Sequence, residues 1–209
     1  MMKVKSFDRR AELIEAALDE FGAKSYEEAS LNSIIKNAGI SKGTFYYHFQ
    51  DKQALYLFLL QAMADAKVEF VERGLADHLR GEEANLFENL KLQVRIGIEF
   101  AKNYPRYYLL GLMFLKEKGN DIYKVAMDSL NDTTERYFED LIEKAVRHGD
   151  IRPGISEHFA AKVVAYLLVR FDELFDFRSG DISFDEVVDD LDSLIDFMKH
   201  GLGSHGTLD

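Results

Sequence analysis

Apolar residues recur at three- and four-residue intervals along most of the chain, which is the spacing of one face of an α-helix. In residues 8–21 they lie on one side and four acidic residues on the other, and Gly22 is placed to end that helix. Residues 31–38 and 42–48 follow, each preceded by a serine that can cap a first turn. The pattern predicts three short helices in the first fifty residues.

The remainder of the chain predicts longer helices. One opens after Asp51 and runs without a breaker to about residue 78. Five more follow, at 86–103, 106–118, 121–148, 156–177 and 183–202. Prolines number only two and β-branched alternation is scarce. We therefore expect an all-α protein with one domain at 1–52 and a larger one at 53–209.

Composition narrows the class further. The 209 residues are 47% hydrophobic and 30% charged, as in a globular protein with a core. The absence of cysteine excludes disulfides and thiolate-bound metals. The longest run without a charged residue, Gln53–Ala64, is shorter than the roughly 20 residues of a membrane span. Acidic residues in the first thirty positions argue against a secretory signal, so we expect a cytoplasmic location.

The charge is unevenly distributed. The net charge is −11, which by itself disfavours binding to phosphates. Residues 1–56, however, hold eight Lys or Arg and eight Asp or Glu, so the whole excess of negative charge lies in 57–209. This asymmetry permits a protein that touches nucleic acid with one end.

Residues 38–52 combine a glycine turn, a short aromatic helix and a new helix start. That order is typical of a helix-turn-helix, whose second helix enters the major groove. The helix start offers Ser41, Lys42, Gly43 and Thr44: hydroxyls, a cation and a residue without a Cβ, all suited to phosphate. Phe45 and Phe49 would anchor the helix inward. The alternative is that the neighbouring tyrosines also belong to a buried aromatic cluster.

These residues also carry a resemblance to a known family. Residues 8–56 resemble the N-terminal domain of TetR-family transcriptional regulators. The residues in step with its motif are Gly39, Ile40, Ser41, Lys42, Gly43, Thr44, Phe45, Tyr46, Tyr47, His48, Phe49, Lys52 and Leu55. The resemblance implies a three-helix DNA-binding domain followed by a larger helical domain for ligand binding and dimerisation. The expected DNA-binding residues are Ser30, Asn32, Lys42, Gly43, Thr44, Tyr46, Tyr47, His48 and Lys52.

The resemblance further implies a homodimer that binds a palindromic operator, most often as a repressor released by a small molecule. Family members usually pair through their last two long helices. The expected dimer residues are Phe159, Val163, Tyr166, Leu167, Arg170, Val187, Leu191, Leu194, Ile195 and Met198. The alternative is that these faces pack only within one subunit.

An excess of aromatic and methionine residues in the body predicts an effector pocket for a hydrophobic or aromatic ligand. Its expected residues are Arg95, Glu99, Phe100, Tyr104, Tyr108, Met113, Phe114, Tyr123, Met127, Phe138, Phe171, Asp172 and Phe175. Each aromatic residue taken singly has core packing as its alternative. We expect the helix from Lys52 to about His78 to connect pocket and DNA-binding domain.

Two other classes compete with a ligand-controlled regulator. An enzyme is disfavoured because the six histidines are dispersed and neither a phosphate loop nor a nucleophile elbow occurs, so no catalytic residue, metal or cofactor is expected. A DNA-binding family member without a small-molecule effector, which organises nucleoid DNA or answers to a protein partner, fits the same sequence. Binding to a specific operator that is released by an effector would distinguish a ligand-controlled regulator from such a protein.

Overall fold

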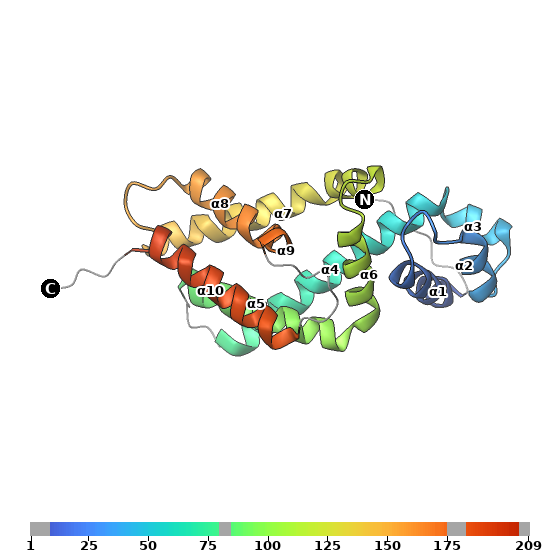
Figure 1. Cartoon of the computed structure of the whole chain (residues 1–209), viewed down its shortest axis with the longest axis horizontal. Helices are drawn as coiled ribbons and strands as arrows, with labels where there is room; N and C mark the ends of the chain where they lie inside the picture. Colours follow the sequence, from blue (N-terminus) through green and yellow to red (C-terminus); the bar gives the residue numbers. More distant parts are fainter. Residues whose placement is uncertain (1–8, 80–84, 175–182, 205–209) are drawn as a thin grey trace. The chain divides into compact units, whose positions relative to one another are not determined.

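The computed structural model describes residues 9–79, 85–174 and 183–204, and within these ranges the regular structure is helical apart from one isolated bridge between Ile151 and Gly203 (Figure 1). The all-α prediction is confirmed. The helices are α1 (Arg10–Ala23), α2 (Leu31–Asn37), α3 (Lys42–His48), α4 (Lys52–Leu79), α5 (Leu86–Asn103), α6 (Pro105–Lys116), α7 (Asp121–His148), α8 (Glu157–Val169), α9 (Phe171–Leu174) and α10 (Phe184–Leu202). In the described part of the chain, no helix has the length and apolarity to cross a membrane.

The chain divides into two compact units. The first comprises Met1–Val68 and Ala101–Ser129, and the second Glu69–Phe100 and Leu130–Asp209. Helices α4, α5 and α7 each contain a boundary between the units. Compactness therefore groups the three N-terminal helices with α6, whereas the expected domain boundary after residue 52 stays a prediction.

Serine side chains fix the starts of four helices. The hydroxyls of Ser30, Ser41, Ser156 and Ser183 each accept a hydrogen bond from the backbone N–H three residues on, at 3.0 to 3.3 Å. Such caps satisfy N–H groups that have no partner within the helix. The predicted starts of α2, α3, α8 and α10 are confirmed.

Two helix ends differ from the prediction. Gly22 lies inside α1, and a Cβ there would come within 3.2 Å of the Leu109 Cβ, so glycine lets α6 approach α1 closely. The helix predicted over 156–177 is interrupted: α8 ends at Val169, because Arg170 leaves the helical region with φ −111° and ψ 21°. Its last part, 175–177, lies outside the described residues.

The second unit is built around one apolar core. Helices α5, α7, α8 and α10 contribute to it, and the side chains of Ile142, Ala160, Val164 and Ile195 are fully buried there. Ion pairs cross from α5 to α10 at its edge, for example Lys91 to Asp196 at 2.7 Å. The two helices lie side by side in Figure 1. The face of α10 that enters this core is consequently occupied within a single chain.

Candidate nucleic-acid interface

The turn between α2 and α3 requires a glycine. Gly39 has φ 65°, a left-handed conformation that side chains with a Cβ rarely adopt. A Cβ here would also lie 2.6 Å from the Nη1 atom of Arg9, which donates a hydrogen bond to the Gly39 carbonyl at 3.0 Å. The turn that joins the two helices is therefore defined both by its backbone and by a side chain from the start of α1.

An aromatic base holds α3 against α4. Phe45 is fully buried and Phe49 is 2% exposed, and their rings stack at 5.8 Å between centroids. The ring of Phe49 also meets the edge of Phe58 on α4 at 5.5 Å. The prediction that Phe45 and Phe49 anchor this helix is confirmed. A helix with only seven residues is too short to be stable alone, so this packing determines its position.

The outward face of α3 carries polar and aromatic side chains. Tyr46 is 57% exposed and Tyr47 is 68% exposed, so neither belongs to a buried cluster. Lys42 is exposed as well, and the half-buried His48 meets the Tyr47 ring edge-on at 4.9 Å. The half-buried Thr44 has its hydroxyl 2.9 Å from that of Ser41. The structure brings these predicted residues together on one short surface.

Gly43 lies on this exposed face, and the fold does not require a glycine there. It has helical backbone geometry, and a Cβ would meet only the Ser41 hydroxyl, at an ordinary 3.6 Å. A glycine costs a helix roughly 1 kcal/mol relative to alanine. No contact of the described chain requires a glycine at this position.

The two residues predicted on α2 have different surroundings. Ser30 caps the helix through its side-chain oxygen, which accepts from the Ser33 N–H at 3.3 Å. Asn32 is exposed in the first turn of α2. Asn32 is therefore the one of the two whose side chain is not already used by the fold.

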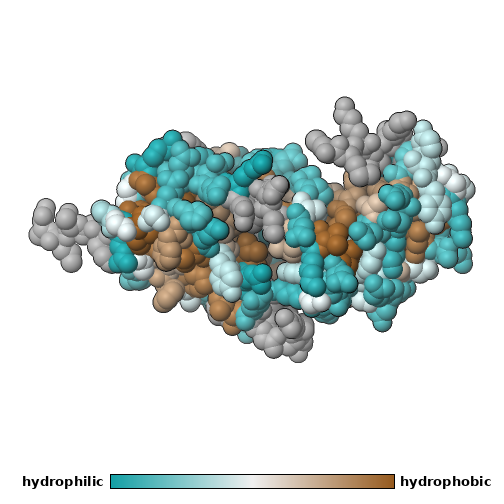
Figure 2. Space-filling view, turned by 90° about the horizontal axis from the view of Figure 1, so that it is seen from above, coloured by the Kyte–Doolittle hydropathy of each residue, from teal (hydrophilic) through white to brown (hydrophobic). Residues whose placement is uncertain are grey.

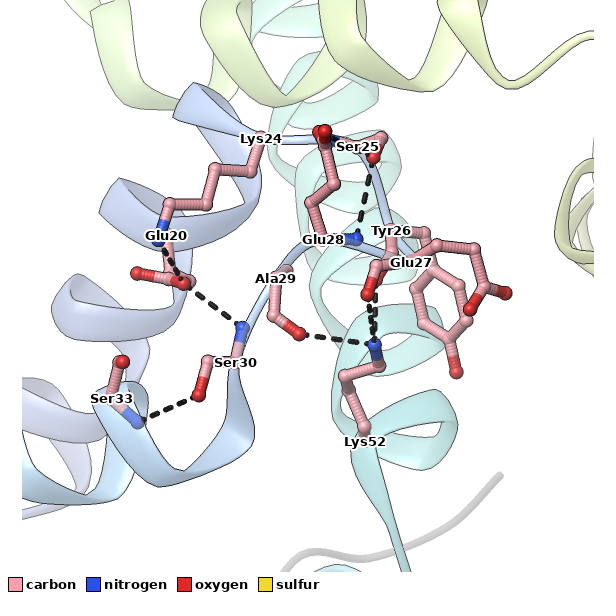
Figure 3. A network of polar contacts seen from close by, with 10 residues as sticks. All are labelled: Glu20, Lys24, Ser25, Tyr26, Glu27, Glu28, Ala29, Ser30, Ser33 and Lys52. Carbon is pink, nitrogen blue, oxygen red and sulfur yellow. Dashed lines mark hydrogen bonds and ion pairs between the residues drawn. The ribbon is translucent and has the colours of Figure 1, made fainter.

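Lys52 has a different role from the predicted phosphate contact. Its ammonium group donates to the carbonyl oxygens of Tyr26, Glu27 and Ala29 at 2.6, 3.4 and 3.0 Å (Figure 3). It also lies 4.4 Å from the centroid of the Tyr26 ring. An ammonium group has three donors, and all three are used. Lys52 thus fixes the segment between α1 and α2, and its assignment as a DNA contact stays a prediction.

Two buried carboxylates hold the same segment, and sequence reasoning missed both. Glu20 is 8% exposed and accepts from Lys24 Nζ at 2.6 Å and from the Ser30 N–H at 2.9 Å (Figure 3). These two hydrogen bonds lower the pKa of the Glu20 carboxyl, and the bond from Lys24 has the larger effect. Glu117, directly after α6, is 2% exposed and accepts from the Tyr26 N–H at 2.6 Å. No local pattern marks either residue as different from the many exposed glutamates.

The predicted effector residues of the first unit are partly at its surface. Phe114 is buried and stacks on Tyr123 at 4.8 Å between centroids. Tyr104, directly before α6, is 43% exposed, and Tyr108 on α6 is 37% exposed. Met113 and Met127 are half-buried.

Those of the second unit are more strongly engaged in packing. Phe100 is buried with its ring against Phe70 at 5.6 Å, whereas Phe138 and the half-buried Phe171 belong to the core described above. Arg95 pairs with Asp192 at 2.7 Å, so its charge is already balanced. Glu99 is exposed. The side chain of Asp172, and the whole of Phe175, lie outside the described residues.

Lys67 is a residue that the sequence reasoning did not single out. It follows Met63 by four positions and precedes Phe70 by three on α4, so it shares a helical stripe with these apolar residues. Its side chain is accessible to water, yet enough protein surrounds the ammonium group that burial lowers the pKa of Lys67. A lysine at this spacing within an apolar stripe is the signal that sequence alone offered.

The predicted dimer residues divide into a buried and an accessible group. Leu191, Leu194, Ile195 and Met198 are at most 9% exposed because they form the core of the second unit. Their side chains are therefore largely occupied within one subunit, and their assignment to an intersubunit seam stays a prediction.

The accessible group lies mainly on α8. Phe159 and Tyr166 are 55% and 61% exposed, and they line a shallow apolar hollow with Lys162, Val163 and Leu167. Figure 2 shows hydrophobic residues, coloured brown, at the surface of the part that contains the second unit. Val187 is half-buried, and Arg170 pairs with Glu173 at 2.8 Å. On α10 the exposed apolar residue is Phe197, which the sequence reasoning did not include.

Comparison with known proteins places this site. A short helix presented by a glycine turn on an aromatic base defines the class of helix-turn-helix DNA-binding proteins. Residues 13–58 match the model of the bacterial regulatory proteins of the tetR family. The N-terminal helices of the chain are therefore similar to those of this family. Among the described residues, no group of three or more His, Asp or Glu side chains has the arrangement of a metal site.

The similar proteins include both a repressor and an activator of transcription. The probable acrEF/envCD operon repressor of Escherichia coli K12 is 28% identical over 123 residues, which cover 57% of this chain and 53% of that protein. The transcriptional activator FasR of Mycolicibacterium smegmatis is 38% identical over 68 residues, 32% of this chain and 31% of that protein. The chain thus spans about half the length, or less, of these curated relatives.

Similarity of fold extends further than similarity of sequence. The structure of the regulator FadR of Bacillus subtilis in complex with stearoyl-CoA has a TM-score of 0.69. The match covers 91% of this chain and 98% of that one, at 16% identity. The likeness therefore extends to the helical body as a fold.

Proposed function

We propose that this protein is a DNA-binding regulator of transcription that binds a palindromic operator as a homodimer and represses the adjacent genes. The observation that carries the proposal is the outward face of α3, where Lys42, Gly43, Tyr46 and Tyr47 are exposed above a buried aromatic base. Cations, hydroxyls and phenol groups are the side chains that contact phosphates and base edges. Repression is favoured over activation by the E. coli relative, which matches more of the chain than the activator does.

Gly43→Ala provides the most direct test, because it moves stability and binding in opposite directions. A Cβ fits at Gly43, so the variant should melt at the same or a slightly higher temperature, by roughly 0.5–1 kcal/mol of helix propensity. Its affinity for the operator should fall about tenfold or more, because the methyl group blocks close approach of the DNA backbone. Fluorescence anisotropy with DNA flanking the coding region, across a salt series, measures this.

The same titration can also contradict the proposal. Equal binding of both proteins to flanking and scrambled DNA, with a steep salt dependence, would mean that only phosphates are contacted. That result would favour the DNA-organising alternative and reject operator-specific regulation. A variant that binds the operator as tightly as the wild type would remove Gly43 from the interface.

The homodimer is proposed to form through the exposed apolar surface of α8 together with Phe197 of α10. The aromatic rings of Phe159 and Tyr166 extend from α8, and aromatic side chains are enriched at the centres of interfaces. Phe197, which is 71% exposed, has the small exposed residues Ser193 and Gly201 one turn before and one turn after it. Small residues beside a large one allow another helix to come close. Two reading heads would then occupy half-sites about 34–36 Å apart.

The effector is proposed to be a hydrophobic molecule with an anionic group, bound by the body and by Lys67. Aromatic and methionine side chains among the predicted residues suit the apolar part. The exposed ammonium group of Lys67 can form an ion pair with an anionic ligand. The FadR structure supports this chemistry, because stearoyl-CoA joins a long acyl chain to phosphates. Carboxylates, phosphates and acyl-CoA thioesters form the candidate class.

Stearoyl-CoA is the probe with which we would test the effector proposal. At about 100 times its dissociation constant a ligand stabilises a protein by roughly 2.7 kcal/mol, a rise of about 5–10 °C in melting temperature for a chain of this size. Operator affinity should also fall, and the operator should weaken stearoyl-CoA binding by the same factor, since coupling is reciprocal. Lys67→Met should shrink both effects, whereas Lys144→Met, at an exposed position of α7, should not. No rise with acyl-CoA thioesters or free fatty acids would reject the ligand class.

A further inference from the structure

The segment between α1 and α2 is held from two sides by charged groups of opposite sign. Lys52 of α4 donates to its carbonyl oxygens, as described above (Figure 3). On the other side, Oε1 of Glu117 accepts from the backbone N–H of Tyr26 at 2.6 Å. Tyr26 is 91 positions away from Glu117 in sequence, so this bond ties the end of α6 to the DNA-binding helices.

Glu117 is itself fixed in place. It is 2% exposed, and its second oxygen accepts from Nδ2 of Asn120 at 2.7 Å. Next to this bond the Tyr26 ring packs against Tyr56 with 5.0 Å between centroids. Burial raises the pKa of Tyr56, and the charge of Glu117 adds to this rise, which indicates a dry surrounding. A buried, charged acceptor with a single bond to a backbone N–H is strong and directional.

The tie continues to α2 through adjacent residues. Three positions after Tyr26, the carbonyl of Ala29 accepts from Lys52, and the next N–H, of Ser30, donates to Glu20. Ser30 is the residue that caps α2. Helix α2 precedes the glycine turn that carries α3. A change at Glu117 therefore reaches the reading helix through the five residues Tyr26–Ser30, helix α2 and the glycine turn.

We propose that Glu117 is a positioning residue for DNA reading: its carboxylate fixes the α1–α2 segment to the end of α6 and thereby sets the position of α2 and α3. The inference rests on the proposed DNA-binding function and adds a residue outside the helix-turn-helix to it. It also gives α6 a direct connection to the head, in addition to the continuous helix α4. A displacement of the carboxyl end of α6 acts on the head through this bond.

Substitutions at Glu117 can test separately whether the length of the side chain or its charge is required. Glu117→Gln keeps the length and an acceptor oxygen but removes the charge, whereas Glu117→Asp keeps the charge and shortens the side chain by one methylene. We expect the Gln variant to bind operator like the wild type and the Asp variant to bind about tenfold more weakly. Glu117→Ala should resemble Asp. If Ala does not fold, the Gln and Asp pair decides the test.

Electrostatics alone predicts a different relation to the wild type. Removing a negative charge from a DNA-binding protein strengthens its attraction to phosphates. Gln and Ala would then both bind more tightly than the wild type, and Asp would bind like the wild type. Glu28→Ala is the matched control, because Glu28 is an exposed carboxylate of the same segment that bonds only to Ser25. It should bind as tightly as the wild type or more tightly. Equal affinities of the Asp and Gln variants would overturn the proposal.

Amide hydrogen exchange tests the inference without the operator. In the Asp variant the Tyr26 amide should exchange at least tenfold faster, and the amides of α2 should follow, while the Gln variant keeps wild-type rates. If no DNA is bound specifically by the wild type, the proposed function fails and this readout still applies. Unchanged exchange of Tyr26 and α2 in the Asp variant would overturn the positioning role even if the operator is bound.

Discussion

Lys52→Met is expected to lower the free energy of unfolding by about 2–4 kcal/mol and to reduce operator binding by roughly a hundredfold or more. Methionine keeps the aliphatic stem but cannot donate, so the carbonyl oxygens of Tyr26, Glu27 and Ala29 lose their shared partner. Buried or half-buried acceptors without donors are costly. The α1–α2 segment would loosen, and α2 and α3 would lose their fixed position. Chemical denaturation and anisotropy measure the two effects.

Lys42→Met is the matched control, since Lys42 is exposed on the outward face of α3. It should leave stability within about 0.5 kcal/mol. Its operator affinity should fall with a salt dependence reduced by about 0.9, the value for one lost phosphate contact. Lys52→Met, by contrast, should keep the wild-type salt slope. A Lys52→Met protein with unchanged stability and a reduced slope would restore the phosphate contact that the sequence suggested.

Much of the helical framework follows from local chemistry and was predictable. Ser30, Ser41 and Asp51 cap the helices that follow them, and Asp51 accepts from the Ala54 N–H at 2.7 Å. The inward role of Phe45 and Phe49 follows from their spacing of four. These features depend on neighbours within a few residues, so the sequence contains the necessary information.

The network around Tyr26 depends on contacts that no local pattern encodes. Lys52 looks like a phosphate contact because it opens a helix beside the reading motif, but its partners are carbonyl oxygens more than twenty positions earlier. Glu117 differs from exposed glutamates only through the fold that buries it. A charged residue at the start or the end of a helix therefore has a clear role only once its distant neighbours are known.

The apolar face of α10 shows a second limit of sequence reasoning. Its spacing correctly indicates a helix with one buried face, in which Leu194 and Ile195 take part. Periodicity gives the face that is covered, but it does not say whether the same chain or a second copy covers it. Here the helices of the same unit do. The exposed aromatic residue of α10, Phe197, stands outside that stripe.

Phe197→Arg is accordingly expected to convert the dimer into a folded monomer. Phe197 is 71% exposed, so an arginine at this position meets water in the single chain and a desolvated, unpaired charge in the interface. Light scattering should give about half the wild-type mass. Circular dichroism should show the same helix content, and the melting temperature should cease to depend on concentration. Operator affinity should fall by roughly a hundredfold or more, because one head reads only one half-site.

Leu194→Arg, on the same helix, separates the interface from the core. Leu194 is 9% exposed among Leu191, Ile195 and Met198, and an arginine there buries an unpaired charge. We expect a loss of more than about 3 kcal/mol and a protein that is largely unfolded at 37 °C. If Leu194→Arg instead gave a stable monomer while Phe197→Arg remained a dimer, the seam would lie on the face first indicated by periodicity. Opposite behaviour of the two variants places the interface on the exposed side of α10.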